Sequence, residues 1–378
     1  MVDILILTVS KEEYENARER GQYLLWTQEM HEIFLTLAPH TWRFRSFHLQ
    51  VHDGHCKAVA RHYIGTKDGK IFGPAPNLET WQLYHFENFR NVGDLHEATR
   101  RQPVTCFADN IPKLKNLSLI GVNLPWNSPY LKDLQNLELS LHTNSIRPEY
   151  EHWSNMLSRS PELRTLFLHY SGPQSPAESQ WPVAVITLPK LEKLGLVDLE
   201  PEYLQQITSR LDTPNVKKLE IELRDEEDET VVYDDWLRCI SANGSHKFQS
   251  LVSLKITELQ CGDFDTSLRM FLGTLNQLRE LEMKDEVWSS VWRMFVVDLE
   301  WDGEHDGRWR YRRWRADIVL ASSFLPFIAT RARRLVQPED DEDVGVEEDM
   351  EDIDDDELEA YDDDEPVEYS EEEEEEEE

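Results

Sequence analysis

A short apolar motif recurs along most of the chain at intervals of a few tens of residues. The stretch IPKLKNLSLIGVNL, residues 111–124, places Leu114, Leu117 and Leu119 in the order L-x-x-L-x-L. With other apolar residues allowed, nine copies begin at Phe44, Leu78, Leu114, Leu134, Leu163, Leu191, Val216, Leu251 and Leu278. Repetition of one motif at such a spacing is typical of solenoid proteins, in which stacked units share a core.

Each copy predicts a strand, because L-x-L places two leucines on the same face of a strand. Apolar residues at helical spacing predict helices in residues 147–160, 201–211 and 264–275. We therefore predict an α/β fold: an irregular leucine-rich repeat solenoid with a parallel sheet on its concave face and helices outside. An ordinary α/β domain of alternating strands and helices would also contain leucine-rich strands, and stays open as the alternative.

Negative charge is concentrated at one end of the sequence. Residues 339–378 hold 28 of the 75 acidic residues and no Lys or Arg, whereas residues 1–338 carry a net charge of only −8. A segment so acidic and so poor in apolar residues cannot offset the entropy of ordering, so we expect it to be disordered. Its field repels nucleic acids and anionic membranes and attracts basic partners.

These patterns divide the chain into four predicted regions. Residues 1–40 form a helical or capping segment, residues 41–300 the leucine-rich repeat solenoid, residues 301–338 a C-terminal cap with a basic aromatic segment, and residues 339–378 the acidic tail. The four cysteines have no metal-ligand or redox-motif spacing, which favours reduced thiols and a cytoplasmic or nuclear location. We expect neither a signal peptide nor a membrane span.

The repeats also resemble a known family. Residues 111–173, and in particular RPEYEHWSNMLSRSPELRTL between two motif copies, resemble the leucine-rich region of fungal, mushroom-type F-box proteins. LAPHTWRFRSFHLQV and TLPKLEKLGLVDLEPEYLQQI are similar to its flanking parts, so that the resemblance covers roughly residues 35–285. It implies a substrate receptor whose repeats hold a target protein and whose F-box binds the Skp-type adaptor of a cullin ubiquitin ligase.

The chain departs from that pattern in two places. No F-box is recognisable before the repeats, so a Skp-type adaptor is an expected partner only if an F-box lies upstream. Regular leucine-rich repeats carry an Asn after the strand whose side chain bonds neighbouring backbones, whereas Val122, His142 and Leu199 stand at that offset here. We expect other groups to satisfy these turns.

Motifs for catalysis and metal binding are incomplete. The His-Glu pairs that begin at His31 and His96 lack the second His of a zinc-binding H-E-x-x-H helix. The calcium-loop-like segment 298–309 ends on Trp309, where a bidentate Glu is needed. We expect no enzyme activity, no cofactor and no metal.

Two sets of residues remain as candidates for function. The first would project from the concave face as a partner-binding surface: His48, Tyr84, Phe167, His169, Glu220, Glu222, Lys255, Glu280 and Glu282. The second is the basic patch of RWRYRRWR: Arg308, Arg310, Arg312, Arg313 and Arg315. Arginines interleaved with aromatics can stack on bases, but we predict that the nearby acidic tail screens this patch. The alternative interpretation is that the residues of both sets are ordinary solvated side chains without a binding role.

The predicted function is therefore a non-enzymatic protein–protein interaction scaffold, similar to an F-box substrate-recognition module. The rival is a chaperone of basic proteins such as histones, because a repeat domain followed by a long acidic tail is similar to the acidic leucine-rich nuclear phosphoproteins.

Overall fold

A computed structural model describes most of the first 283 residues and a short hairpin beyond them. The described residues are 1–9, 11–20, 24–52, 54–65, 71–85, 103–175, 181–182, 184–223, 233–242, 247–259, 264–283, 299–302 and 308–311. The chain divides into two compact units, Met1–Phe324 and Leu325–Glu378, and the second lies wholly outside the described residues. The expected disorder of residues 339–378 and the tail's predicted screening of the basic patch therefore fall outside them too.

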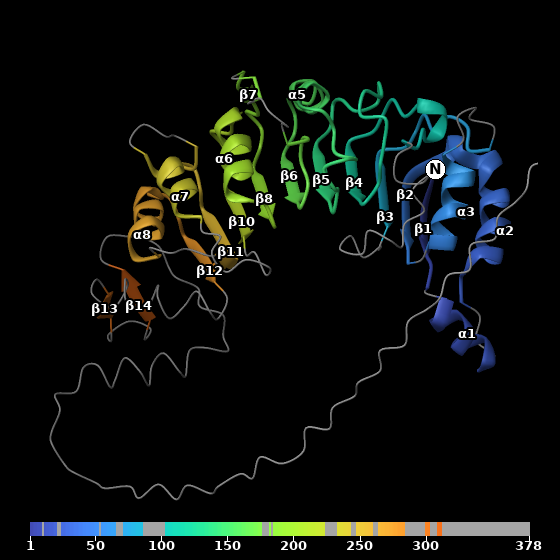
Figure 1. Cartoon of the computed structure of the whole chain (residues 1–378), viewed down its shortest axis with the longest axis horizontal. Helices are drawn as coiled ribbons and strands as arrows, with labels where there is room; N and C mark the ends of the chain where they lie inside the picture. Colours follow the sequence, from blue (N-terminus) through green and yellow to red (C-terminus); the bar gives the residue numbers. More distant parts are fainter. Residues whose placement is uncertain are drawn as a thin grey trace, which may run out of the picture. The chain divides into compact units, whose positions relative to one another are not determined.

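Ten of the described strands form one parallel sheet, and their order in the sheet follows their order in the chain (Figure 1). The strands are β1 (Val2–Leu7), β2 (Phe44–Val51), β3 (Thr80–His85), β4 (Asn116–Ile120), β5 (Asn136–Ser140), β6 (Thr165–His169), β8 (Lys193–Val197), β10 (Lys218–Leu223), β11 (Ser253–Leu259) and β12 (Glu280–Met283). The expected α/β fold with a large parallel sheet is confirmed.

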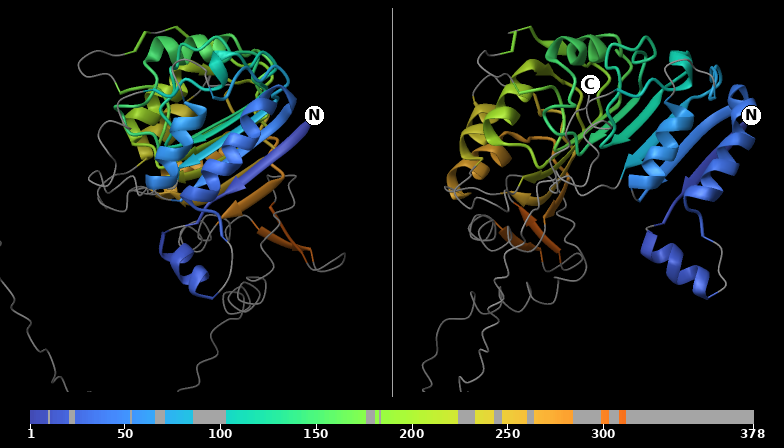
Figure 2. Two further views of the ribbon diagram at one scale, coloured as in Figure 1. Left: turned by 90° about the vertical axis from the view of Figure 1, so that its right-hand side faces the viewer. Right: turned by 45° about the vertical axis from the view of Figure 1, so that its right-hand side comes forward.

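Helices run between the strands and lie on one face of this sheet (Figure 2). They are α2 (Thr27–Leu37), α3 (Gly54–Ile64), α5 (Tyr150–Ser158), α6 (Pro201–Arg210), α7 (Asp234–Ser241) and α8 (Phe264–Thr274), with α1 (Lys11–Glu19) and the 3-10 turns η1 (Ala38–Arg43) and η3 (Phe107–Asp109) completing the described helical segments. The three helices expected from apolar spacing are confirmed as α5, α6 and α8. No helix in the described part is long and apolar enough to cross a membrane.

The nine motif copies coincide with nine strands, β2 to β12 without the two-residue strands β7 and β9. All of their motif residues whose side chains are described are buried, Leu114, Leu117 and Leu119 among them. Neighbouring strands pair one to one, so that Leu117 lies opposite Leu137, and Leu137 opposite Leu166. Helix residues such as Trp153 pack into the same core. Each fully buried leucine contributes roughly 1.5–3 kcal/mol, which explains why one motif determines these nine strands.

The first forty residues contribute a strand as well as helices. β1 pairs in parallel with β2 and is the edge strand of the sheet, and Val2, Leu5 and Leu7 of VDILIL have the spacing of the motif although they were not among the nine copies. Ile6 on β1 is buried, whereas Leu5 is 67% exposed and Leu7 is 51% exposed. The segment expected to be helical or capping therefore extends the sheet by one strand.

Two small sheets complete the described elements. The two-residue strands β7 (Ile186–Thr187) and β9 (Leu211–Asp212) pair in parallel beside α5 and α6. β13 (Leu299–Asp302) and β14 (Arg308–Tyr311) form an antiparallel pair in the predicted C-terminal cap. Its register sets Glu300 opposite Arg310 and Asp302 opposite Arg308.

Four consecutive strands, β4, β5, β6 and β8, end in the same backbone turn. The residue after each strand has a left-handed backbone: Gly121 (φ 64°), Leu141 (φ 54°), Tyr170 (φ 45°) and Asp198 (φ 47°). Each of these residues donates its N–H to a carbonyl of the next strand in the sheet, at 2.8–2.9 Å. The acceptors Ser140, His169 and Val197 are the last residues of their strands, and Glu222 is the last but one of β10. Only glycine adopts this conformation without strain, so the repeated hydrogen bond offsets a repeated steric cost.

The side chain of His142 makes hydrogen bonds that satisfy the turns after the strands. Its Nε2 lies 3.1 Å from the carbonyl oxygen of Val122, and its Nδ1 lies 3.0 Å from Ser171 Oγ. The ring thus joins the turns that follow β4, β5 and β6. Burial and the positive charge of Arg147 outweigh the hydrogen bond to Val122 and lower the pKa of His142 from 6.5 to about 3.

We predict that His142 makes folding stability depend on pH. The imidazole is neutral in the folded protein, while the unfolded chain binds a proton below its ordinary pKa of about 6.5. Stability is therefore complete above about pH 6.5 and is lost as the pH falls toward 3. This one residue should lower the free energy of unfolding by about 2 kcal/mol between pH 7 and pH 5. Urea denaturation at both values measures it.

His142→Asn is the matched control, because an amide can also bond both neighbours but does not titrate. In this variant, the part of the difference in unfolding free energy between pH 7 and pH 5 that His142 causes should disappear. An unchanged difference between pH 7 and pH 5 would show that another group causes it.

Candidate functional site

The candidate site is the sheet face that the helices leave uncovered, which we call the open face. Side chains alternate along each strand, and the one-to-one pairing aligns the outward ones in three rows across the strands. The first row is Asp3, Ser46, Thr80, Asn116, Asn136, Thr165, Lys193, Lys218, Ser253 and Glu280. The second is Leu5, His48, Gln82, Ser118, Glu138, Phe167, Gly195, Glu220, Lys255 and Glu282. The third is Leu7, Gln50, Tyr84, Ile120, Ser140, His169, Val197 and Glu222.

All nine residues predicted for the concave face lie in these rows. His48, Phe167, Glu220, Lys255 and Glu282 belong to the second row, Tyr84, His169 and Glu222 to the third, and Glu280 to the first. The sequence pattern therefore identified the face on which they lie. Of the predicted basic patch, Arg308 and Arg310 lie on β14, and Arg312, Arg313 and Arg315 lie outside the described residues.

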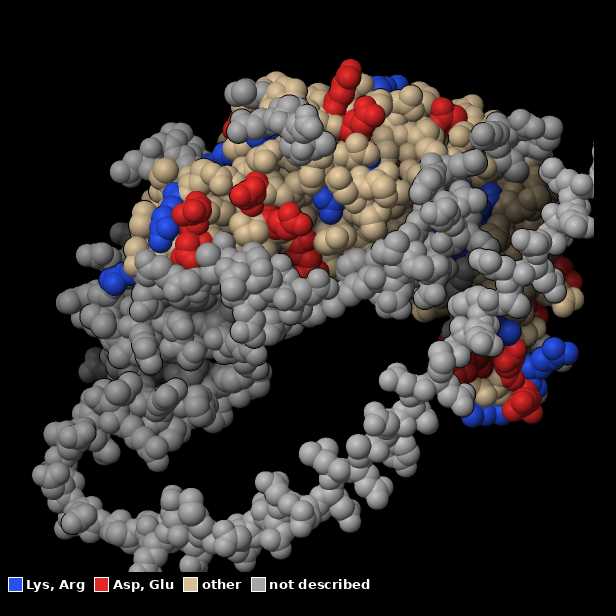
Figure 3. All heavy atoms as spheres, in the orientation of Figure 1, with Lys and Arg blue, Asp and Glu red and all other residues tan. Residues whose placement is uncertain are grey.

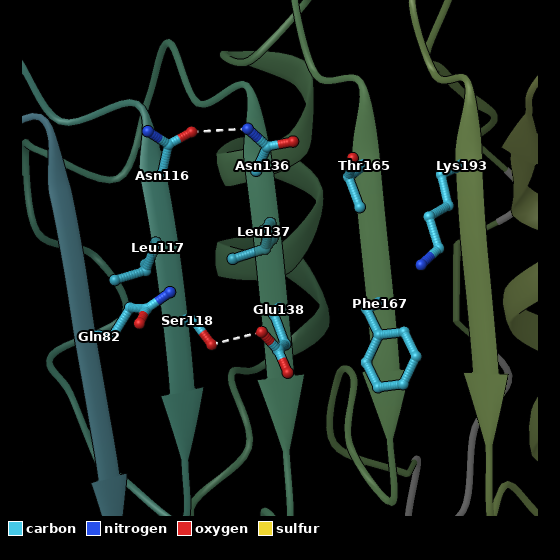
Figure 4. Close-up of a pocket in the computed structure, with 10 residues that line it drawn as sticks. All are labelled: Gln82, Asn116, Leu117, Ser118, Asn136, Leu137, Glu138, Thr165, Phe167 and Lys193. Atoms are coloured by element: carbon cyan, nitrogen blue, oxygen red, sulfur yellow. Dashed lines mark hydrogen bonds between the residues drawn. The ribbon is translucent and has the colours of Figure 1, made fainter. Parts of the chain in front are cut away.

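A hollow of about 270 Å³ opens on this face between β3 and β8 (Figure 4). Figure 4 shows the lining side chains on the near side of the strands, with a helix behind the sheet. The lining residues are Gln82, Asn116, Leu117, Ser118, Asn136, Leu137, Glu138, Thr165, Phe167 and Lys193. Of these, Phe167 belongs to the predicted partner-binding set, whereas the polar lining residues do not. Continuing each row through every motif copy would have found them.

Side-chain amides link three strands at one end of the hollow. Asn136 Nδ2 donates to Asn116 Oδ1 at 2.6 Å, and Asn116 Nδ2 donates to Thr80 Oγ1 at 2.9 Å. These bonds hold the amides in fixed orientations across β3, β4 and β5. Amide side chains offer both donors and acceptors, which suits them to the backbone and polar side chains of a polypeptide.

A second set of hydrogen bonds crosses the same strands one row further on. The hydroxyl of Ser118 lies 2.5 Å from Glu138 Oε2 and 3.1 Å from the hydroxyl of Tyr84. Because a carboxylate only accepts, Ser118 gives its single proton to Glu138. Partial burial and the charge of Glu138 raise the pKa of Tyr84 above its ordinary value.

The floor of the hollow beside Glu138 is aromatic. Phe167 lies opposite Gly195 of β8, and its ring extends over the space that a side chain at Gly195 would fill. A Cβ atom at that position would lie 2.1 Å from Phe167 Cδ2. Figure 4 shows the ring lying along the sheet with its face turned outward. Gly195 thus permits a flat, half-exposed aromatic surface.

Charged residues dominate the open face beyond β6. Glu220 lies 2.7 Å from Lys255 Nζ and 3.4 Å from Lys193 Nζ. Partial burial alone would raise the pKa of Glu220, but the hydrogen bond from Lys255 and the charges of both lysines outweigh it and lower the pKa. His169 Nε2 lies 2.8 Å from Asp198 Oδ2 at the ends of β6 and β8. In the view of Figure 3, acidic and basic side chains are interspersed over the described residues.

The groups that line the hollow are suited to binding a ligand. No group of His, Cys, Asp or Glu among the described residues could hold a metal ion. The hollow instead presents oriented amides, one carboxylate and one aromatic face, which are groups that fix and orient a ligand. No known family model matches the chain, and no curated protein matches it.

We predict that Gly195→Ala destabilises the protein by displacing Phe167. An alanine in a strand is otherwise neutral or favourable, so a cost of roughly 1–3 kcal/mol would reflect the clash. Chemical denaturation measures the free energy of unfolding. The double variant with Phe167→Ala should recover most of the loss, because the small side chain leaves room for the new methyl group. Equal costs of Gly195→Ala with and without Phe167 would contradict this packing.

Proposed function

We propose that the chain is a leucine-rich repeat solenoid that binds a protein target on its open face and performs no catalysis. The solenoid interpretation is supported by nine motif copies on nine strands whose order in the sheet follows the chain. In this proposal the repeats act as a recognition module similar to that of F-box proteins, in the cytoplasm or nucleus. A Skp-type adaptor belongs to it only together with an F-box.

The observation that carries the proposal is the alignment of polar and aromatic side chains in three rows across the parallel sheet. Tyr84, Phe167 and His169 are half-exposed while the leucines between them are buried. Aromatic residues on a rigid face are typical anchors of protein interfaces. The hydrogen bonds among Asn116, Asn136, Ser118 and Glu138 fix neighbouring polar groups before a partner arrives, which lowers the entropic cost of binding.

A second candidate function rests on the acidic tail. Its 28 carboxylates attract basic proteins over a wide area without a shaped site. As a chaperone, the chain would bind histones through residues 339–378 and use its repeats as a scaffold. Membranes and nucleic acids are not partners in either proposal, since the tail repels both.

We predict that target binding depends on the aromatic residues of the open face. Tyr84→Ala with His169→Ala should weaken the affinity for a captured target at least about tenfold, because central aromatic anchors each contribute more than about 1 kcal/mol. Trp42→Ala is the matched control, since Trp42 is an exposed aromatic residue outside the sheet. Affinities come from calorimetry, after denaturation curves have shown that both variants fold. Equal loss in the control would contradict binding on the open face.

Deletion of residues 339–378 separates the two functions. If the open face carries the function, the truncated chain keeps its affinity for the target at physiological salt. The chaperone function predicts strong histone binding by the full chain, weakened by salt and lost on truncation. Fluorescence anisotropy with labelled histones and with the target measures both.

A further inference from the structure

The hollow contains one carboxylate that has no cationic partner among the described residues. Glu138 Oε2 accepts a hydrogen bond from Ser118, and no described Lys, Arg or His lies within salt-bridge distance of either oxygen. By contrast, Glu220 has two lysines and Asp198 has His169. The carboxylate of Glu138 is therefore available to pair with a cation from outside the chain.

An aromatic face lies directly beside this carboxylate. Glu138 and Phe167 are opposite each other on β5 and β6, and neighbouring strands are about 4.8 Å apart. The Phe167 ring lies over Gly195 with its face outward (Figure 4), so a group in the hollow can contact the ring and the carboxylate together. The electron-rich face of a benzene ring attracts cations.

We propose that the hollow receives an arginine side chain of the protein target. The guanidinium stacks on Phe167 and donates hydrogen bonds to Glu138. This inference rests on the proposed function and names the residue type that the open face recognises.

Arginine fits this site better than lysine does. A guanidinium is planar, so it lies flat on the ring while its edge N–H groups reach the carboxylate, whereas an ammonium is a compact, strongly hydrated charge. Lys193, the cation that lines the hollow among the described residues, lies 3.4 Å from Glu220. That pairing offsets much of its repulsion toward an incoming arginine.

Small probes test the site without knowledge of the target. N-acetyl-arginine methylamide and its neutral analogue N-acetyl-citrulline methylamide would be titrated into the full-length chain, with backbone amide NMR shifts of Glu138 and Phe167 as the readout. We expect saturable binding of the arginine probe on the order of millimolar affinity and binding of the citrulline probe at least about tenfold weaker.

Three variants locate the binding. Glu138→Gln and Phe167→Leu should each weaken the arginine probe by about fivefold or more. Glu202→Gln removes an exposed carboxylate from α6, outside the open face, and should change the affinity less than twofold. Equal binding of the two probes, or equal loss in Glu202→Gln, would overturn the proposal in favour of nonspecific attraction to an acidic surface.

The outcomes also separate this inference from the proposed function. If the target binds the open face but its affinity is unchanged by Glu138→Gln, the function stands and the arginine site fails. If the arginine probe binds as expected but no target depends on Tyr84 and His169, the site stands and the function fails.

Discussion

Burial of the motif residues between the sheet and its helices holds every other feature of the structure in place. Leu117, Leu137 and Leu166 occupy one row of the core, each opposite the next, and the pattern continues along the sheet. Because a shift of one residue would turn these leucines to the open face, the core also sets the register. The rows on the open face, the hollow and its hydrogen bonds all follow from that register.

The turns after β4, β5, β6 and β8 share one backbone conformation but are formed by different residue types. Gly121 adopts its left-handed backbone without strain, whereas Leu141, Tyr170 and Asp198 adopt it with a side chain in place. His142 then joins three turns through one buried neutral ring. The stability of this part of the chain therefore depends on apolar burial and also on hydrogen bonds that require a neutral His142 ring.

Most of the strands could be predicted from the sequence, because burial and a period of two leave a mark in each motif copy. β1 was not predicted, because VDILIL is apolar on both faces: Leu5 and Leu7, which have the motif spacing, are exposed, and Ile6 is buried instead. α7 was also not among the helices predicted from apolar spacing, and its first turn holds two acidic residues, Asp234 and Asp235. In both cases contacts with a neighbouring element, which the local sequence does not show, decide the structure.

The sequence predicted the sheet face that carries the candidate site, but not the polar residues that form the hollow. Phe167 and Tyr84 are aromatic residues beside buried leucines and can be recognised in the sequence, but Asn136 and Glu138 are ordinary polar residues until their cross-strand neighbours are known. Gly195 illustrates the limit, since its role comes from a ring that lies 28 positions earlier in the chain. Strand pairing brings together residues that are far apart in the sequence, and it decides which polar side chains are neighbours.

The separation of core and open face lets this chain change one side without rebuilding the other. A substitution at Asn116 or Lys193 leaves the buried leucines untouched, so most positions on the rows can vary one at a time. Phe167 and Gly195 are an exception, because the ring occupies the space above its neighbour. A larger residue at position 195 is compatible only with a smaller one at position 167. A related protein without the Phe167 ring could therefore carry a side chain at position 195 on β8.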